Sequence, residues 1–423
     1  MDFWQKIKLI FKDTDLRKKI LFVLLMLVIF RIGSAIPIPG VDSIRLKAFI
    51  SGNQFFGLLN IFSGGALANM SVVMLGVGPY ITATIIMQLL SMIFPRLKEI
   101  YQEEGEAGRQ KFNQYSRYLT VPLGFLQGLA LLTLLERQQV LVGLTLFDRL
   151  VNVIIVTAGS VFLMWIGELI SEHGIGNGVS LIIFAGIVAS IPASIQQALF
   201  TFDYSQLPVY LGFIVAAVLI IAGVIIVTEG QRPIPVSYAK RIRGMKVYGG
   251  VSTYLPLRVN QAGVIPIIFA LSILLFPQMI ATALSGIHNS VFQNILASFL
   301  LFFNNSWVYA IFYFVLVFLF TYFYTAVTFD PDAISKNLQK SGAFIPGIRP
   351  GKSTAEFISK VLTRITLVGA IFLGLIAVLP LAMKAITGFV SLTIGGTALL
   401  IVVSVILETI KQVQSQVVMR EYE

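Results

Sequence analysis

Ionisable side chains could carry chemistry inside a hydrophobic segment, but here they lie only near the ends of the long apolar runs: Arg31, Arg117, Glu168, Arg364 and Glu408. Charged side chains at such positions commonly extend toward lipid headgroups, and we expect this of all five. The centres of the runs contain no Asp, Glu, Lys, Arg or His. A transporter driven by protons or sodium normally places carboxylates there, and a voltage sensor places arginines. The pattern therefore argues against both classes.

Sequence motifs for catalysis and for cofactors are also missing. The chain has no cysteine, no HExxH, no GxSxG and no GxxxxGK[ST]. These motifs mark metalloproteases, serine hydrolases and nucleotide-binding loops. We therefore expect no enzyme activity, no metal and no cofactor.

Aliphatic pairs beside glycine breaks are the feature that remains. Val77 and Ile81 follow one break, and Val179 and Ile183 repeat the four-residue spacing just after GIGNG. Residues four apart share one face of a helix. Such residues usually pack against neighbouring helices or lipid. A ring of them could instead close a pore by excluding water, without binding what passes through it. The spacing leaves both interpretations open.

Hydropathy places these residues in a polytopic helical membrane protein. Of the 423 residues, 57% are hydrophobic and 12% are charged, with a mean hydropathy of +0.86. A run of 18 or more apolar residues is long enough to span a bilayer. We predict ten spans, near 20–36, 72–94, 116–135, 150–170, 178–200, 207–228, 262–284, 306–328, 362–383 and 390–408. The apolar runs at 55–68 and 291–303 are too short to span.

Basic residues are distributed unequally between alternate connections. Lys and Arg number six in residues 1–19, five in 95–117, six in 229–260 and six in 329–364. The opposite connections hold Arg45, Lys47, Arg137, Arg149 and Lys384. Because basic connections remain in the cytoplasm, both termini are predicted to be cytoplasmic.

Span parity suggests two halves, residues 1–202 and 203–423. Two halves with five spans each must have opposite orientation, which is the geometry of an inverted repeat. The second half contains two long cytoplasmic connections, 229–260 and 329–360. The first predicts a β-hairpin around Gly249-Gly250, and the second a short helix from Ala333 to Lys340. Such basic loops could simply set topology and contact headgroups, or they could dock a large cytosolic partner such as ribosomal RNA.

Several long motifs, in order along the chain, resemble those of the SecY/Sec61α family. They include FRIGSAIPIPG at 30–40, FSGGAL at 62–67, GVGPYITATIIMQLL at 76–90, EEGEAGRQKFNQYSRYLT at 103–120, LMWIGELISEHGIGNGVSLIIFAGIV at 163–188, YLPLRVNQAGVIPIIFA at 254–270, FYTAVTFDP at 323–331 and GAFIPGIRPGKST at 342–354. The resemblance extends from about residue 20 to 420. It implies an all-α membrane protein with ten transmembrane helices, in two inverted five-helix halves around a central hourglass pore with a short plug helix.

The resemblance also implies roles for individual residues. It assigns the pore ring to Val77, Ile81, Val179, Ile183, Ile268 and Ile401. The plug would span about 55–70, including Phe56, Leu59, Phe62, Ser63, Gly64 and Gly65, with the last three as its flexible part. Gln88 and Asn260 would lie at a lateral gate, although they could equally make ordinary interhelical hydrogen bonds. The resemblance assigns docking of the motor and the ribosome to Lys240, Arg241, Arg243 and Arg349.

The implied function is that of the central channel subunit of the Sec protein translocase in the bacterial cytoplasmic membrane. Such a channel passes unfolded secretory polypeptides and releases membrane segments sideways. The implied partners are the small subunits SecE and SecG, the SecA motor ATPase, the ribosome, signal sequences, nascent chains and lipid. The alternative is a secondary transporter built on inverted repeats, which the missing midplane carboxylates and the two large basic loops disfavour.

Overall fold

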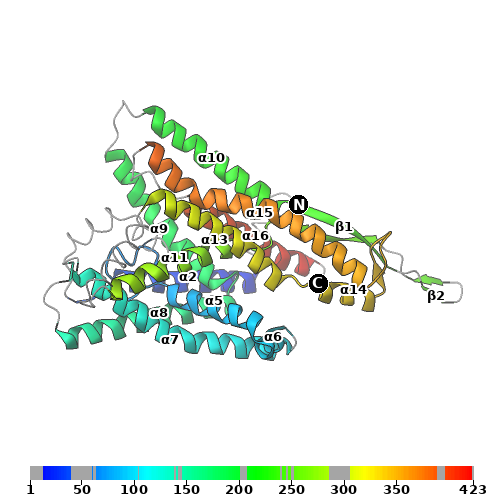
Figure 1. Cartoon of the computed structure of the whole chain (residues 1–423), viewed down its shortest axis with the longest axis horizontal. Helices are drawn as coiled ribbons and strands as arrows, with labels where there is room; N and C mark the ends of the chain where they lie inside the picture. Colours follow the sequence, from blue (N-terminus) through cyan, green and yellow to red (C-terminus); the bar gives the residue numbers. More distant parts are fainter. Residues whose placement is uncertain are drawn as a thin grey trace.

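Long helices form most of the structure (Figure 1). The computed structural model describes residues 13–39, 60, 63–102, 104–137, 140–141, 145–200, 207–238, 241–243, 246–248, 252–284, 305–387 and 396–421. Its helices are α2 (Thr14–Ala35), α5 (Gly78–Ile93), α6 (Pro95–Gln102), α7 (Gly105–Arg137), α8 (Leu146–His173), α9 (Gly178–Phe200), α10 (Leu207–Glu229), α11 (Ile265–Leu284), α13 (Ser306–Thr328), α14 (Pro331–Lys340), α15 (Lys352–Thr387) and α16 (Gly396–Glu421).

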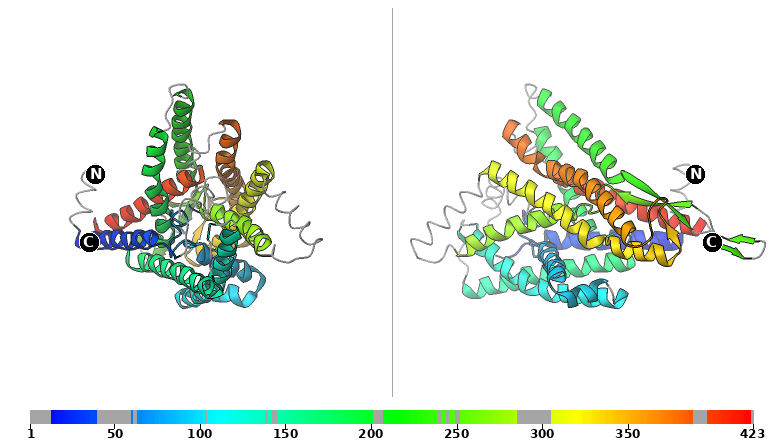
Figure 2. Two further views of the ribbon diagram at one scale, coloured as in Figure 1. Left: turned by 90° about the vertical axis from the view of Figure 1, so that its left-hand side faces the viewer. Right: turned by 45° about the vertical axis from the view of Figure 1, so that its right-hand side comes forward.

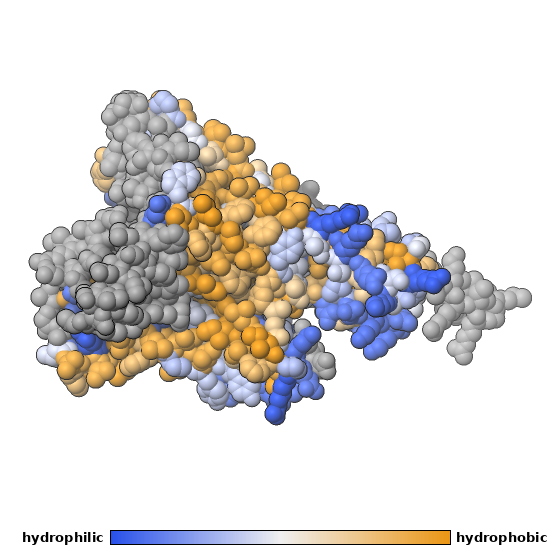
Figure 3. Space-filling model, in the orientation of Figure 1, coloured by the Kyte–Doolittle hydropathy of each residue, from blue (hydrophilic) through white to orange (hydrophobic). Residues whose placement is uncertain are grey.

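Each of the ten expected spans coincides with one of these helices, which confirms the multi-pass helical architecture. By length and composition alone, six helices of the described part could cross a membrane, and α5 with α6 would make a seventh. Apolar residues cover the visible face of the bundle, and hydrophilic residues gather at the end that carries β1 and α14 (Figure 3). The short run 291–303 lies outside the described residues.

The expected span at 72–94 is wrong at its beginning. Residues 72–77 form turns, and α5 begins only at Gly78. Gly76 has φ +59°, and Pro79 occupies the first turn of α5, where proline needs no intrahelical partner for its nitrogen. After Ile93 the chain bends by 116° into α6. Gly76, Gly78 and Pro79 therefore lie at the beginning of α5, and not in the middle of a longer helix.

The helices surround a shared apolar centre. Seen along the long axis, they form a ring of segments around that centre (Figure 2). The largest hydrophobic cluster draws buried residues from α2, α5, α8, α9, α11, α13, α15 and α16, and Val224 from α10. The strongly apolar α10 lies at the edge of the bundle and exposes Leu211, Ile214 and Val218 by 55–61%. Such exposed aliphatic side chains suit contact with lipid.

A small sheet extends from one end of the bundle (Figure 1). It consists of β1 (Gln231–Tyr238), β4 (Ser252–Arg258) and β5 (Ala343–Phe344), in the order β4-β1-β5. The antiparallel pairing of β1 with β4 confirms that this loop forms a hairpin, and β2 (Arg241–Arg243) pairs with β3 (Lys246–Tyr248) farther out. The predicted centre at Gly249-Gly250 is wrong, because both registers place the centre of the hairpin between Arg243 and Lys246. Helix α14 confirms the short helix predicted in the second loop.

The two long basic loops form one unit, which hydropathy did not predict. Strand β5 of the second loop pairs with Ser237 and Tyr238 of the first. Beneath the sheet lies a separate apolar core, formed by Ile234, Val236, Leu257, Ala343, Ile345, Ile358 and Val361. We call this unit, made of the sheet, the β2–β3 pair beyond it, α14 and the first turns of α15, the arm.

Leu257→Ala is expected to loosen the arm and leave the membrane bundle folded. Leu257 is fully buried, and truncating a buried leucine typically costs about 2–5 kcal/mol. Limited trypsin digestion in detergent should then cleave faster after Arg258 and Lys336. Tyr254→Ala removes a side chain that is 66% exposed, so it should leave cleavage unchanged. Equal cleavage in both variants would show that the buried core does not hold the arm together.

Candidate functional site

Six aliphatic side chains from four helices meet in the central cluster. Ile81, Ile183 and Ile268 are 1–7% exposed, and Val179 packs against them as a partly buried neighbour. Val77 and Ile401, each 1% exposed, belong to the same cluster. These are the residues of the expected pore ring, and burial in the centre of the bundle excludes a lipid-facing position for them. We call this group the aliphatic ring.

Local backbone geometry positions the ring on α5 and α9. Val77 precedes α5, and its carbonyl accepts from the Ile81 amide at 3.0 Å. At the start of α9, the Gly178 amide donates to Ser171 Oγ at 2.9 Å. A Cβ on Gly178 would lie 1.9 Å from the Gly167 carbonyl oxygen, so glycine allows α9 to begin directly against α8. The GIGNG motif therefore fixes where Val179 and Ile183 lie.

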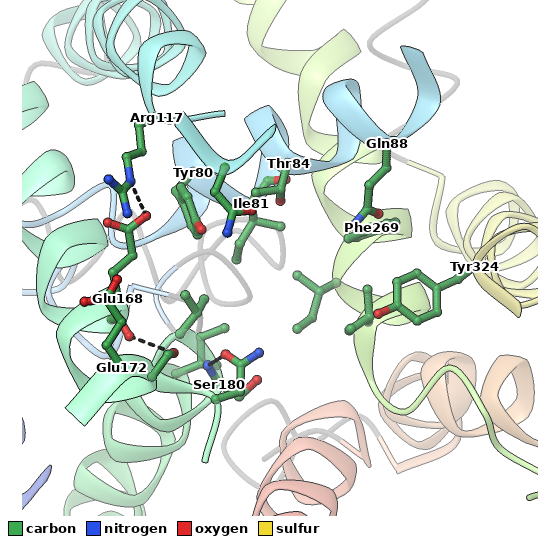
Figure 4. Close-up of a pocket in the computed structure, with 18 residues that line it drawn as sticks. Tyr80, Ile81, Thr84, Gln88, Arg117, Glu168, Glu172, Ser180, Phe269 and Tyr324 are labelled. Atoms are coloured by element: carbon green, nitrogen blue, oxygen red, sulfur yellow. Dashed lines mark hydrogen bonds and ion pairs between the residues drawn. The ribbon is translucent and has the colours of Figure 1, made fainter. Parts of the chain in front are cut away.

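A cavity of about 340 Å³ opens above the ring, and Figure 4 shows its lining. Its floor includes Ile81, Val179, Ile183 and Ile268. One wall, from α7 and α8, is polar, and the opposite wall, from α11 and α13, carries Ile265, Phe269 and Tyr324. We call this cavity the vestibule. It offers an entering chain one polar and one apolar surface above an uncharged constriction.

The polar wall contains an ion pair. Arg117 Nε donates to Glu168 Oε1 at 2.7 Å, and both residues line the vestibule. The expected extension of these two side chains toward headgroups is therefore wrong. A partly exposed pair of this kind contributes about 1 kcal/mol or less to stability. Its larger effect is that the Arg117 charge is balanced within the wall, which also carries the Glu172 carboxylate.

Arg31 also has a different role from the one expected. Its Nη1 donates to the Gly64 carbonyl at 3.0 Å, so it contacts the segment just before α5 instead of only reaching toward headgroups. The sequence missed both arginine contacts because each joins residues 33 or 51 positions apart. Only the folded arrangement of the helices brings these partners together.

The two expected gate residues belong to different elements, and their place at a lateral gate stays a prediction. Gln88 of α5 lines the vestibule and points toward Phe269 of α11 (Figure 4). Its Oε1 is buried and lacks a hydrogen-bond partner within the described structure. Asn260 precedes α11, where its Nδ2 donates to the Gly263 carbonyl at 3.1 Å. Gly369 of α15 approaches the backbone of Val259 and Asn260. Gln88 therefore marks the seam between α5 and α11, whereas Asn260 supports the connection into α11.

The segment Ser63–Met70 forms a bonded, buried turn. The Asn60 side chain accepts from the Ala68 amide at 2.8 Å, and Ser63 Oγ accepts from the Leu67 amide at 3.1 Å. Gly64 and Gly65 have φ of +70° and +79°, a region that glycine enters without strain. Met70 adopts φ +46° although it is not glycine. Of the expected plug residues, Phe56, Leu59 and Phe62 lie outside the described residues.

Three of the expected docking residues, Arg241, Arg243 and Arg349, lie in the arm. Arg349 is exposed on the turn between β5 and α15. Its carbonyl accepts from Thr354 Oγ1 at 2.9 Å, and Ser335 Oγ of α14 donates to the Gly351 carbonyl at 2.6 Å. These bonds order the turn that presents the guanidinium. Arg241 and Arg243 lie in β2, and Lys240 lies outside the described residues.

Comparison with known proteins identifies the family. A family model named SecY matches residues 71–410. Proteins described as "Protein translocase subunit SecY" are 45% identical in Mycobacterium tuberculosis, over 97% of each chain, and 45% identical in Corynebacterium glutamicum, over 98% of each chain.

Solved channel structures share the fold. One described as "The structure of a protein conducting channel" has a TM-score of 0.65 at 19% identity, covering 94% of this chain and 92% of that one. Another, on the plug domain of the SecY protein, has a TM-score of 0.64 at 20% identity with the same coverage. The matched family is one of translocation channels, not of enzymes. By the family model and by its similarity to these relatives over nearly its whole length, the chain belongs to the SecY family.

Proposed function

We propose that this chain is the protein-conducting channel subunit of a translocase and that the aliphatic ring is its constriction. The observation that carries this proposal is the meeting of six aliphatic side chains, five buried and Val179 partly buried, in one cluster at the vestibule floor. A translocating polypeptide varies in charge and size along its length, so a selective binding site would hold it back. A compliant apolar ring excludes water at rest and accepts any side chain in turn.

The two walls of the vestibule suit the two routes of a polypeptide, through the ring or sideways into lipid. Polar stretches follow the α7–α8 wall toward the ring, and apolar stretches pack against α11 and α13. The seam between α5 and α11, marked by Gln88, is the proposed lateral gate through which signal sequences and membrane segments reach lipid. Its buried, unpaired Oε1 favours opening, because leaving a buried acceptor unsatisfied costs about 1–3 kcal/mol.

The proposed plug is the segment of about residues 55–70. Its described part, Ser63–Met70, is buried below the ring and leads through turns into α5. Because Ala66 belongs to the same cluster as Val77 and Ile81, the plug and the ring share one apolar seal.

The proposed driving force comes from cytosolic partners. The chain contains no nucleotide-binding motif, so a SecA-type motor ATPase or a translating ribosome supplies the energy. Lys240, Arg241, Arg243 and Arg349 of the arm are the proposed docking residues. SecE and SecG are the proposed small subunits of the complex.

The proposed orientation places the vestibule, the arm and both termini on the cytoplasmic side of a bacterial cytoplasmic membrane. It follows from the excess of basic residues in 1–19, 95–117, 229–260 and 329–364. We also propose that residues 1–202 and 203–423 form the two halves of the channel.

Deleting residues 56–69 is expected to make the resting channel leak ions. The deletion removes the buried turn whose Ala66 packs in the same apolar cluster as the ring, so closure would rest on the ring without that packing. Conductance of the reconstituted chain in planar bilayers, without motor or precursor, measures the effect. Unchanged conductance would remove the plug assignment. Saturable uptake of a small solute, with no conductance in either protein, would favour the secondary transporter.

A further inference from the structure

The turn Ser63–Met70 is attached to the bundle differently at its two ends. At the Met70 end, main-chain bonds join the turn to the segment after α2. The Ile38 amide donates to the Met70 carbonyl at 2.8 Å, and the Val72 amide donates to the Ile36 carbonyl at 2.9 Å. Pro37 and Ser71 form the β-bridge between these bonds. This end is a main-chain anchor that need not move.

The beginning of the turn is held by a side chain. The main-chain bonds of Gly65 and Ala66 are all local: the Gly65 amide donates to the Asn60 carbonyl at 2.8 Å, and Ala66 bonds to Ser63 and Ser71. From outside the turn, Arg31 Nη1 donates to the Gly64 carbonyl at 3.0 Å. A single charged donor can be exchanged for water far more easily than a pair of ladder bonds.

Gly64 also meets Gly186 of α9 backbone to backbone. A Cβ added to Gly186 would lie 2.0 Å from Gly64 Cα, and one added to Gly64 would lie 2.5 Å from Phe30 Cζ and 3.0 Å from Gly186 Cα. Contacts this short leave room for glycine alone at both positions. Glycine within a helix is unfavourable relative to alanine, so α9 gives up some intrinsic stability to keep this contact.

The contact shares a helix face with the ring. Val179, Ile183 and Gly186 are spaced by four and then three residues, so they lie along one side of α9. With a rise of 1.5 Å per residue, Gly186 lies about 10 Å along α9 from Val179. Val179 and Ile183 line the vestibule, whereas Gly186 contacts Gly64 beyond the ring. A movement of α9 that widens the ring therefore also displaces the surface on which Gly64 rests.

We propose that Arg31 and Gly186 form the seat of the plug, with Arg31 as a releasable clasp and Gly186 as a contact that couples plug release to ring opening. The proposal rests on the proposed plug and channel function. Arg31 and Gly186 are positioning residues: they act through Gly64 and need not touch the polypeptide. When α9 shifts, Gly64 loses its support, Arg31 releases the carbonyl, and the turn swings about the Met70 anchor.

The test compares resting conductance among matched variants in planar bilayers. Gly186→Ala should raise conductance toward that of the 56–69 deletion, because the added methyl displaces the Gly64 backbone. Gly212→Ala, where an added Cβ meets nothing within 4 Å, should match wild type. Arg31→Met should raise the open fraction by about tenfold, since hydrogen bonds from charged groups are among the stronger ones. Arg31→Lys keeps a charged donor, so it should raise the open fraction less than Arg31→Met does.

A second assay measures translocation of a secretory precursor into vesicles that contain the same variants. It distinguishes a weakened plug contact from a misfolded chain. Gly186→Ala and Arg31→Met should both keep ATP-driven translocation while leaking at rest. Arg364→Met, which removes another arginine near a span end, should not leak. If the deletion leaks but neither seat variant does, the seat is wrong and the plug stands. If the deletion itself fails to leak, the plug assignment fails and the seat fails with it.

Discussion

Arg349→Glu is expected to reduce ATP-driven precursor translocation at least tenfold while leaving the channel folded. The side chain is exposed on a turn that the bonds from Ser335 and Thr354 hold in place, so the substitution reverses a charge without removing a buried contact. A tenfold effect corresponds to about 1.4 kcal/mol of docking free energy, which is no more than the loss of one close charged contact at an interface costs.

Two companion variants show whether the Arg349 effect is specific. Arg349→Lys keeps the charge but loses the planar guanidinium, and it should have an intermediate rate. Lys352→Glu reverses an exposed charge three residues along the chain, and it should cost less than Arg349→Glu. The measurement is the initial rate of translocation against motor concentration. If Arg349→Glu and Lys352→Glu reduced the translocation rate equally, the motor would respond to the overall positive charge of the arm, and Arg349 would not be a specific docking residue.

The double substitution Ile183→Ser and Ile268→Ser is expected to open the resting pore to ions. Both side chains are at most 7% exposed, and they contribute to the ring from α9 and α11. Shortening them removes apolar packing and introduces hydroxyls that favour water in the constriction, so closure by dewetting fails. Single-channel recording should show long openings without motor or precursor.

Ile214→Ser provides the control for that experiment. Ile214 lies on α10 and is 61% exposed, so its loss changes lipid contact alone and should leave conductance at the wild-type level. If the ring variant remained closed, the aliphatic ring would not be the constriction. If Ile214→Ser also leaked, the leak would reflect general destabilisation of the bundle.

Hydropathy and charge predict much of this fold because both are local properties. Ten helices occupy the ten expected spans, and the alternating residues on either side of Gly249-Gly250 pair as β1 and β4 of the arm. The resemblance adds the identity of the ring residues, and the structure brings all six into one cluster. Spacing alone could not do this, because Val and Ile recur on many faces of apolar helices.

Contacts between distant segments could not be predicted in this way. Arg117 and Glu168 read as separate residues at span ends, and only the packing of α7 against α8 makes them a pair. The approach of Gly64 to Gly186 depends on how turns before α5 meet α9. The late start of α5 was missed because apolar composition does not distinguish helix from turns in 72–77. In each case the decisive information is three-dimensional.

The central claim is that this chain conducts polypeptides, and one measurement tests it most directly. The chain is reconstituted into vesicles with its small subunits and a motor ATPase, and protease protection of a secretory precursor is followed with and without ATP. The account predicts that ATP produces a protected, full-length precursor and that Arg349→Glu removes most of this fraction. A precursor that remained fully degradable with ATP, with Arg349→Glu no different from wild type, would contradict the account.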